Sequence, residues 1–278
     1  DDVGKGSYRQ MGMSSEKMKI ILIGAGNLAT RLALALQAKG LAPEWVYSRT
    51  EESARRLGEQ LPHSHYTTRL DSLPTDGDLY IFAVKDSVLP QLLSAMPANA
   101  GLWVHTAGSV DREVFRPYTN RYGVFYPMQT FSKERAVDFD DIPFFIEANS
   151  EADTDLLHDL AARLSGKVYR ADSEQRKYLH LAAVFACNFT NHLYALCDRI
   201  LQEHNLPFEA MLPLIRETAA KVTDMPPFDA QTGPAIRYDQ NIIAMQEALL
   251  TDPTMREIYT LLSRSIHETH NPDKPKES

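Results

Sequence analysis

The sequence predicts an α/β protein, with an N-terminal doubly wound, mostly parallel sheet followed by an all-helical C-terminal domain. Three observations support this fold class. The first half alternates short β-branched runs with helical periodicity, a pattern typical of parallel strands joined by crossover helices. A glycine-rich turn links its first strand to its first helix, and from Asp172 onward only helical patterns remain.

Eight short runs are predicted as the strands of the sheet. The first, at 19–23, is apolar throughout, as expected for a parallel strand that is buried on both faces. The other predicted strands lie at 45–48, 65–68, 79–84, 102–106, 121–126, 143–148 and 167–170. Two helices alternate with the early strands, one at 27–39 that ends at Gly40 and one at 51–60 that is capped by Thr50.

The helical half begins at a predicted capping box. In Asp172-Ser-Glu-Gln175 the first and fourth side chains can cap each other's backbone. A long helix is expected from there to about His204, and three more helices at 208–223, 234–250 and 254–270. We therefore expect two domains, 18–171 and 172–270, between disordered tails at 1–17 and 271–278.

Composition restricts the classes of partner and the compartment. The net charge is −8 at pH 7 and no basic patch stands out, so the sequence predicts no nucleic-acid partner. No apolar run approaches the roughly 20 residues of a membrane span. Cys187 and Cys197 make a poor disulfide framework and suit a reducing compartment, so we expect a cytoplasmic protein. No cluster of side chains has metal-ligand spacing, and we expect no metal.

The glycine-rich turn is the sharpest motif. It reads Gly24-Ala-Gly26-Asn27-Leu28-Ala29, directly after a strand and at the start of a helix, which is the context that a Rossmann dinucleotide site requires. Gly24 allows the tight turn, and Gly26 lets the backbone approach a pyrophosphate at the helix N-terminus. The alternative is a turn that merely packs closely.

The end of the second predicted strand indicates which dinucleotide binds. NAD-binding domains usually place an acid there, about 20 residues after the glycines, to bind the ribose hydroxyl. This chain has Ser48-Arg49-Thr50 instead. Two hydroxyls and a planar guanidinium suit a 2′-phosphate, which favours NADP over NAD. The alternative is that Arg49 is an ordinary solvated side chain.

With these motifs, the sequence resembles the 6-phosphogluconate dehydrogenase-like superfamily, which includes pyrroline-5-carboxylate reductase, ketopantoate reductase and deazaflavin-dependent NADP oxidoreductases. The glycine turn, the 48–50 tip and Ala83-Val84-Lys85-Asp86 carry the resemblance, which implies that Val84 and Lys85 border the cofactor. The stretches 123–131, 180–188 and 231–239 resemble Rossmann proteins whose C-terminal domain has no assigned function.

This resemblance implies an NADP-dependent oxidoreductase that transfers hydride between NADP(H) and a small carbonyl, imine or hydroxy compound. It also implies a homodimer formed through the helical domain, as is frequent among relatives. It does not specify the substrate.

The resemblance also points to catalytic residues on the long helix. Ketopantoate reductases carry a lysine early in this helix and an asparagine eight residues later, and His180 and Asn188 fall on those two positions. The lysine is therefore absent. Because histidine titrates near neutral pH, we expect His180 to donate a proton and Asn188 to orient the substrate or the histidine. The alternative for both is a hydrogen-bonded core residue.

Further candidates follow from their predicted position in the crevice at the carboxyl ends of the strands. His105 and Ser109 follow the fifth strand, and Tyr126 and Gln129 follow the sixth. At 100° per residue, Asn191 shares one side of the long helix with His180.

Arg237 could clamp a substrate carboxylate, or could pair with Asp239 to fix a helix start. His158, His267 and His270 are expected to be solvated.

Two functions of other classes stay open at this point. One is a non-catalytic NADP-binding redox sensor, which the missing lysine would permit. The other is a methyltransferase that uses S-adenosylmethionine, although the absent acid at the strand tip argues against adenosyl ribose binding.

Overall fold

The computed structural model describes residues 17–132 and 134–272 and divides the chain into two compact units, the first ending at Cys187 and the second beginning at Asn188. The predicted domain boundary at 171/172 lies just before α5 (Ser173–Ala183), ahead of the division between the units. The tails predicted as disordered fall outside the described residues, except for residues 17, 271 and 272.

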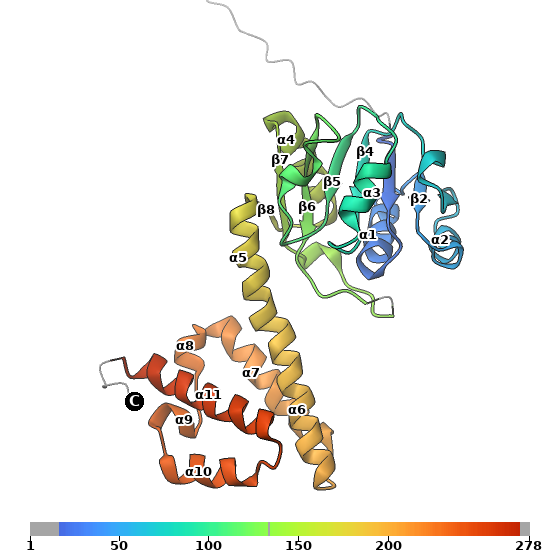
Figure 1. The fold of residues 1–278 in the computed structure, drawn as a ribbon. Helices are drawn as coiled ribbons and strands as arrows, with labels where there is room; N and C mark the ends of the chain where they lie inside the picture. The colour runs from blue at the N-terminus through green and yellow to red at the C-terminus, as the bar shows by residue number, and fades with distance from the viewer. Residues whose placement is uncertain (1–16, 133, 273–278) are drawn as a thin grey trace, which may run out of the picture. The chain divides into compact units, whose positions relative to one another are not determined.

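The first unit contains an eight-stranded sheet in the order β3-β2-β1-β4-β5-β6-β7-β8 (Figure 1). Its strands are β1 (Ile20–Ile23), β2 (Trp45–Tyr47), β3 (His65–Thr67), β4 (Leu79–Phe82), β5 (Leu102–His105), β6 (Tyr122–Pro127), β7 (Phe144–Ala148) and β8 (Val168–Arg170). All pairs are parallel except β6 with β7. The predicted fold class and all eight predicted strands are confirmed.

Helices cover both faces of this sheet, and successive side chains along a strand point to opposite faces. Ile20 and Leu22 of β1 pack into one core cluster with residues of α1 (Asn27–Ala38), α2 (Glu51–Gly58) and α4 (Glu151–Leu164). Ile21 and Ile23 pack into the opposite cluster, with residues of α3 (Leu89–Ala95) and the 3-10 turn η2 (Arg112–Phe115). Of these helices, α1 and α2 were predicted from the sequence and α3 and α4 were not.

The long helix is not a continuous α-helix. It consists of α5, a π-helical segment η4 (Val184–Phe189) and α6 (Thr190–Glu203). The capping box at Asp172 and Gln175 is confirmed by both reciprocal hydrogen bonds. In a π-helix each bond closes over one more residue, so a rotation of 100° per residue does not apply across η4. The rotation on which the predicted alignment of Asn191 with His180 was based therefore does not hold across this segment, and the alignment remains a prediction.

The second unit is entirely helical. After α6 it continues with η5 (Phe208–Met211), α7 (Leu212–Asp224), α8 (Pro227–Ala230), α9 (Pro234–Arg237), α10 (Gln240–Leu249) and α11 (Pro253–His270). The predicted single helix at 234–250 is wrong. The chain leaves α9 at Tyr238, which adopts a left-handed conformation (φ 51°), and Asp239 then caps α10 through the Ile242 amide.

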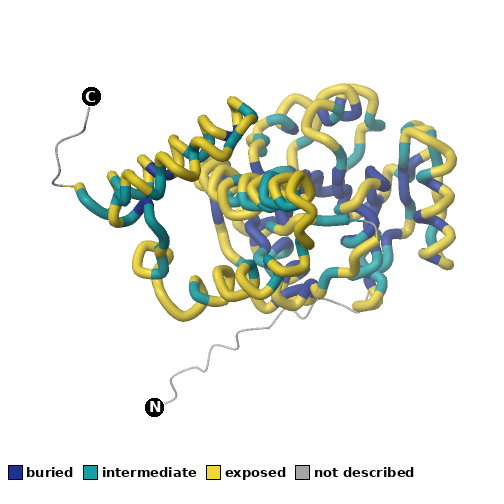
Figure 2. Tube along the Cα trace, turned by 90° about the horizontal axis from the view of Figure 1, so that it is seen from below, coloured by how far each residue is buried: buried dark blue, intermediate teal, exposed yellow. Residues whose placement is uncertain are grey.

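Few side chains of the second unit are buried within it. Among its described residues only Ala235, Met255 and Ser263 are buried, whereas Leu214 and Leu249 are 60% and 74% exposed. In Figure 2 the helices of this unit are mostly yellow and teal, and dark blue follows the sheet of the first unit. No helix in the described ranges is long and apolar enough to cross a bilayer.

Two histidines that were expected to be solvated are instead structural in the second unit. His270 Nε2 and Nδ1 lie 2.9 Å from the Phe228 and Ile266 carbonyl oxygens, and the His270 ring stacks on Phe228. The His267 ring stacks on Tyr238. Phe228 and Tyr238 lie far away in sequence, which is why helix periodicity alone could not reveal these contacts.

Candidate functional site

The glycine turn after β1 has the geometry that a dinucleotide site needs. Gly24 adopts φ +129°, and a Cβ there would lie 2.1 Å from the Ala83 carbonyl oxygen, so only glycine fits without a backbone shift. Gly26 is the N-cap of α1 without a side-chain cap, and a Cβ there would project into open space. The first amides of α1 can therefore receive a diphosphate beside Gly26.

Asn27 and Leu28 follow at the start of α1. The Asn27 side chain donates to the Phe131 carbonyl oxygen at 3.1 Å, which ties the segment after β6 to the helix start. Leu28 packs against the core. If these residues bind the cofactor as predicted, they do so through their backbone amides rather than their side chains.

The β2 tip lies where the sequence predicts the ribose phosphate. The Ser48 amide donates to the Thr67 carbonyl oxygen, Arg49 is exposed, and Thr50 Oγ1 caps α2 by accepting from the Ser53 amide at 3.4 Å. This leaves the guanidinium and two hydroxyl groups at one strand end, a donor set that fits a 2′-phosphate.

A cavity of about 260 Å³ adjoins both the glycine turn and α2. It is lined by Ala25, Thr30, Ser53, Arg56, Leu57, Gln60 and Glu134. Arg56 thus supplies a second guanidinium near the turn, which the sequence analysis missed. Arg56 lies within the charged run of α2, so its position in the sequence does not distinguish it from a solvated side chain.

Val84 and Lys85 follow β4. Val84 Cγ1 would be 3.3 Å from a Cβ on Gly24, so Val84 borders the glycine turn. Lys85 is exposed, and its carbonyl oxygen accepts from the Val88 amide just before α3. The structure therefore brings both residues to the edge of the predicted cofactor site.

The loop after β5 brings Ser109 and His180 together. Ser109 Oγ donates to Asp86 Oδ2 at 2.9 Å, which links this loop to the one after β4. A Cβ on the preceding Gly108 would lie 2.9 Å from His180 Nδ1 and 3.0 Å from its Cβ and Cγ. The His180 imidazole of α5 therefore rests directly on the backbone beside Ser109, and it remains exposed.

His105 occupies a different environment. It is 1% exposed, its ring stacks on Phe115, and its Nδ1 accepts from the Ala107 amide at 3.1 Å. Burial, and secondarily the positive charge of Arg176, lower the pKa of His105 to about 3. A neutral imidazole of this kind supports the loop, and the predicted catalytic role of His105 remains a prediction.

Tyr126 and Gln129 contribute less than their position suggested. Tyr126 lies within β6 and is buried, and burial raises its pKa. Gln129 Oε1 accepts from the Thr130 amide at 2.8 Å, so the amide group of Gln129 is bonded within its own loop.

A buried ion pair that was not predicted from the sequence lies next to this site. Arg176 is completely buried and donates to Glu147 of β7. Glu147 was the available signal, because a charge inside the apolar strand Phe144–Ala148 requires a partner. Arg176 itself lies in a charged stretch of sequence and resembles a solvated residue.

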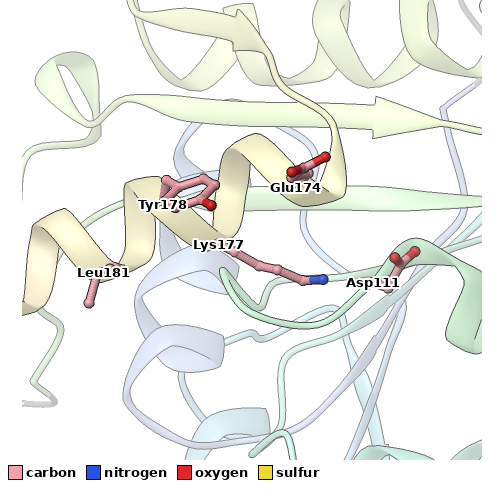
Figure 3. A pocket seen from close by; sticks show the side chains of 5 residues that line it. All are labelled: Asp111, Glu174, Lys177, Tyr178 and Leu181. Carbon is pink, nitrogen blue, oxygen red and sulfur yellow. The ribbon is translucent and has the colours of Figure 1, made fainter.

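An open cavity of about 530 Å³ lies on the neighbouring face of α5 (Figure 3). It is lined by Asp111, Glu174, Lys177, Tyr178 and Leu181, and the Lys177 side chain extends toward Asp111. An amide hydrogen bond from Glu113, together with the nearby positive charges, lowers the pKa of Asp111. The lining mixes both charge signs with apolar surface and indicates no single ligand class.

The remaining predicted residues belong to the second unit. Asn188 lies in η4, Asn191 lies in α6, and Arg237 ends α9; all three are exposed. Their substrate roles remain predictions. Across the described ranges, no three His, Cys, Asp or Glu side chains are arranged to hold a metal.

The fold and the glycine turn define a Rossmann-type dinucleotide-binding protein. Residues 19–104 match the family model of coenzyme F420-dependent NADP oxidoreductases, and residues 142–266 match a domain of unknown function, DUF2520. A solved protein from Bacteroides fragilis, described as an NADP oxidoreductase, is 55% identical, with 91% of this chain and 98% of that chain covered and a TM-score of 0.84. The chain belongs to this family of NADP oxidoreductases.

Two more distant structures share the fold. A reductive aminase from Aspergillus terreus, in complex with NADPH and ethyl levulinate, is 18% identical, with 91% and 95% of the two chains covered and a TM-score of 0.68. A pyrroline-5-carboxylate reductase from Coxiella burnetii is 16% identical, with 92% of this chain and 94% of that chain covered and a TM-score of 0.58. The predicted resemblance is thus confirmed. No curated protein matches the chain.

Proposed function

We propose that this protein is an NADPH-dependent reductase of small imines, with carbonyl compounds as the second substrate class. The observation that carries the proposal is the shared strand edge. At this edge the glycine turn follows β1, Val84 and Asp86 follow β4, and Ser109 follows β5. Ser109 donates to Asp86, and His180 rests on Gly108. The fold shared with a reductive aminase and a pyrroline-5-carboxylate reductase supports the substrate class, since reductive amination passes through an imine and a pyrroline is a cyclic imine.

The residues of the site divide the work of the reaction. NADPH, when bound, supplies the hydride. The α1 amides and Gly26 hold its diphosphate, and Arg49 with Ser48 holds its 2′-phosphate. His180 donates a proton to the imine nitrogen as the neighbouring carbon is reduced, and Ser109 can bind the same nitrogen. Asn188, Gln129, Asn191 and Arg237 are proposed as substrate contacts.

We further propose a cytoplasmic homodimer formed through the helical unit. The exposed leucines of α7 and α10, and the scarcity of buried residues in that unit, support an interface. A second copy would bury surface of the kind that a monomer seldom exposes.

Calorimetric titration tests the cofactor assignment. Wild-type protein should bind NADPH much more tightly than NADH, and Arg49→Ala should remove most of that preference. Arg116→Ala is the matched control, because the side chain of this arginine, directly after η2, is 79% exposed. Absence of binding by either nucleotide would refute the proposal.

Turnover tests the reaction class. NADPH oxidation is followed with small cyclic imines, with ketones and amines together, and with ketones alone. The expected result is consumption with imines and a loss of about 10²- to 10⁴-fold in His180→Ala. His158→Ala, on the exposed surface of α4, should leave the rate unchanged. NADPH binding without turnover of any compound would favour the redox-sensor function instead.

A further inference from the structure

A buried arginine joins the start of α5 to the interior of the sheet. The Arg176 side chain is completely buried, and its Nη1 donates to Glu147 Oε1. Ser173 Oγ donates to the same carboxylate oxygen at 2.6 Å, and Arg112 Nη1 lies 3.6 Å from Glu147 Oε2. Glu147 lies within β7, opposite Val124 of β6, so the anchor point is rigid.

The same guanidinium also reaches the loop after β5. Arg176 Nη2 donates to the Val110 carbonyl oxygen at 2.7 Å. One turn earlier, Ser173 Oγ accepts from the Arg112 amide at 3.2 Å. The loop that carries Gly108 and Ser109 is therefore bound to α5 next to the helix start.

His180 follows Arg176 by one helical turn and lies on the same face of α5. Its ring rests on Gly108. A Cβ added to Gly108 would lie within 3.0 Å of three side-chain atoms of His180, namely Nδ1, Cγ and Cβ. The Cβ of a helical residue cannot move without the helix. Any side chain at residue 108 would therefore require the His180 imidazole, the loop or α5 to shift.

Stability alone does not account for the Arg176–Glu147 pair. Replacing a buried ion pair with apolar residues of similar volume is often neutral or stabilising, whereas removing one partner is strongly destabilising. The distinctive property of Arg176 is that its planar fork binds Glu147 and Val110 at once, which fixes two elements relative to each other.

We propose that Arg176 and Gly108 are positioning residues for the reaction of this enzyme. Arg176 holds the 106–111 loop against α5, and Gly108 provides the surface on which the His180 imidazole is held beside Ser109. The proposal rests on the proton-donor role of His180 given under Proposed function.

The main test separates positioning from stability in the full-length protein. Arg176→Met should lower the melting temperature because the buried Glu147 loses its buried charge partner and keeps only the Ser173 hydroxyl and the more distant Arg112, and Arg176→Met with Glu147→Leu should restore it. With NADPH and methylpyrroline as the imine, the double variant should still turn over at least about tenfold more slowly, because the Val110 carbonyl has lost its donor and the loop shifts. NADPH affinity should stay unchanged.

A second arginine–carboxylate pair provides the matched control. Arg121 and Asp153 form an ion pair at 2.6 Å between the start of β6 and α4, and Asp153 is also largely buried. Arg121→Met with Asp153→Leu should leave the imine rate unchanged. Recovery of the wild-type rate by the Arg176→Met, Glu147→Leu variant together with its stability would overturn the proposal.

Gly108→Ala tests the other residue while the ion pair stays intact. It should slow imine reduction by at least about tenfold with NADPH affinity retained, because the imidazole or the loop must move. Arg176→Lys covers the case in which the double variant fails to fold: it keeps the charge near Glu147 but not the fork, and should also be slow. A wild-type rate in both variants would contradict positioning.

A spectroscopic readout does not depend on turnover. In protein with ¹³C-labelled histidine, the His180 resonance is assigned by its loss in His180→Gln. Its chemical shift should change in Gly108→Ala and in the Arg176→Met, Glu147→Leu variant, but not in the Arg121→Met, Asp153→Leu control. A changed resonance in a protein without imine activity would refute the proposed function and retain the positioning; an unchanged resonance would refute the positioning.

Discussion

The first unit of the chain buries a large apolar core, whereas the second unit buries few of its described apolar residues. In the first unit α1 and α4 cover one face of the sheet, and Leu32 of α1 is 0% exposed. In the second unit Leu261 of α11 is 56% exposed. A folded unit with so small a core needs a further contact to be stable, so the comparison favours a second copy of the chain as part of the native state.

The same substitution in both units tests this contrast most strongly. Leu32→Ala should lower the free energy of unfolding by about 2–5 kcal/mol, since it leaves a cavity in a packed core. Leu261→Ala should change it by no more than about 0.5 kcal/mol if the side chain stays in solvent. Both values come from urea unfolding followed by circular dichroism. A loss above about 2 kcal/mol at Leu261 would show that a partner covers it, and the contrast would then vanish in the assembled protein.

Charge placed on the exposed leucines tests what covers the second unit. Leu214→Asp and Leu249→Asp should each weaken the proposed dimer by about 1.5–3 kcal/mol, the free energy of burying one such side chain. Analytical ultracentrifugation over a range of concentrations measures the shift toward monomer. Tyr118→Asp, at a 41% exposed aromatic residue of the first unit, is the control and should have no effect. A wild-type protein that is monomeric at all concentrations would contradict the prediction.

The same contrast explains which features could be predicted from the sequence. Strands such as Ile20–Ile23 and the turn at Gly24 are local patterns whose physical cause lies within a few residues, and both were predicted correctly. The π-helical segment Val184–Phe189 and the left-handed Tyr238 leave no such pattern, because tertiary packing determines them. The sequence therefore indicated the first unit well and the second unit only as helical.

In the candidate site, too, only features with a local sequence pattern could be predicted. The candidate cofactor residues could be proposed from the sequence because the Rossmann motif is contiguous. The contact of His180 with Gly108 and the pairing of Arg176 with Glu147 join residues that are far apart in the chain. Only Glu147, as a lone charge in an apolar strand, could have raised the question of a partner.

A histidine in each unit predicts opposite responses to pH. His105, in the first unit, has a pKa lowered to about 3, mainly by burial. The unfolded chain binds this proton below about pH 6.5 and the folded chain does not, so stability falls as the pH drops from about 6.5 toward 3, by at most about 1.4 kcal/mol per pH unit. Urea unfolding between pH 4 and 7 measures the slope. His105→Gln should flatten it, and an unchanged slope would show that other groups cause the acid sensitivity.

His270, in the second unit, should act in the other direction and more weakly. Both of its ring nitrogens lie 2.9 Å from carbonyl oxygens, and a neutral imidazole has only one N–H, so both hydrogen bonds need the protonated ring. These bonds, first that to Phe228 and then that to Ile266, raise the pKa of His270. Its stabilisation is thus fully present below about pH 6.5 and is lost as the pH rises through the raised value.

Hydrogen exchange of the 228–238 segment gives the measurement. This segment is held to the end of α11 at Phe228 by His270, at Ile236 by Asn271 and at Tyr238 by His267. After correction for intrinsic rates, its exchange should increase between pH 6 and 8.5 in the wild type and be fast at both pH values in His270→Ala. His204→Ala, at the C-cap of α6, is the control. Exchange that is independent of pH in the wild type would mean that the neutral ring suffices, and that one of the two short contacts is not a hydrogen bond.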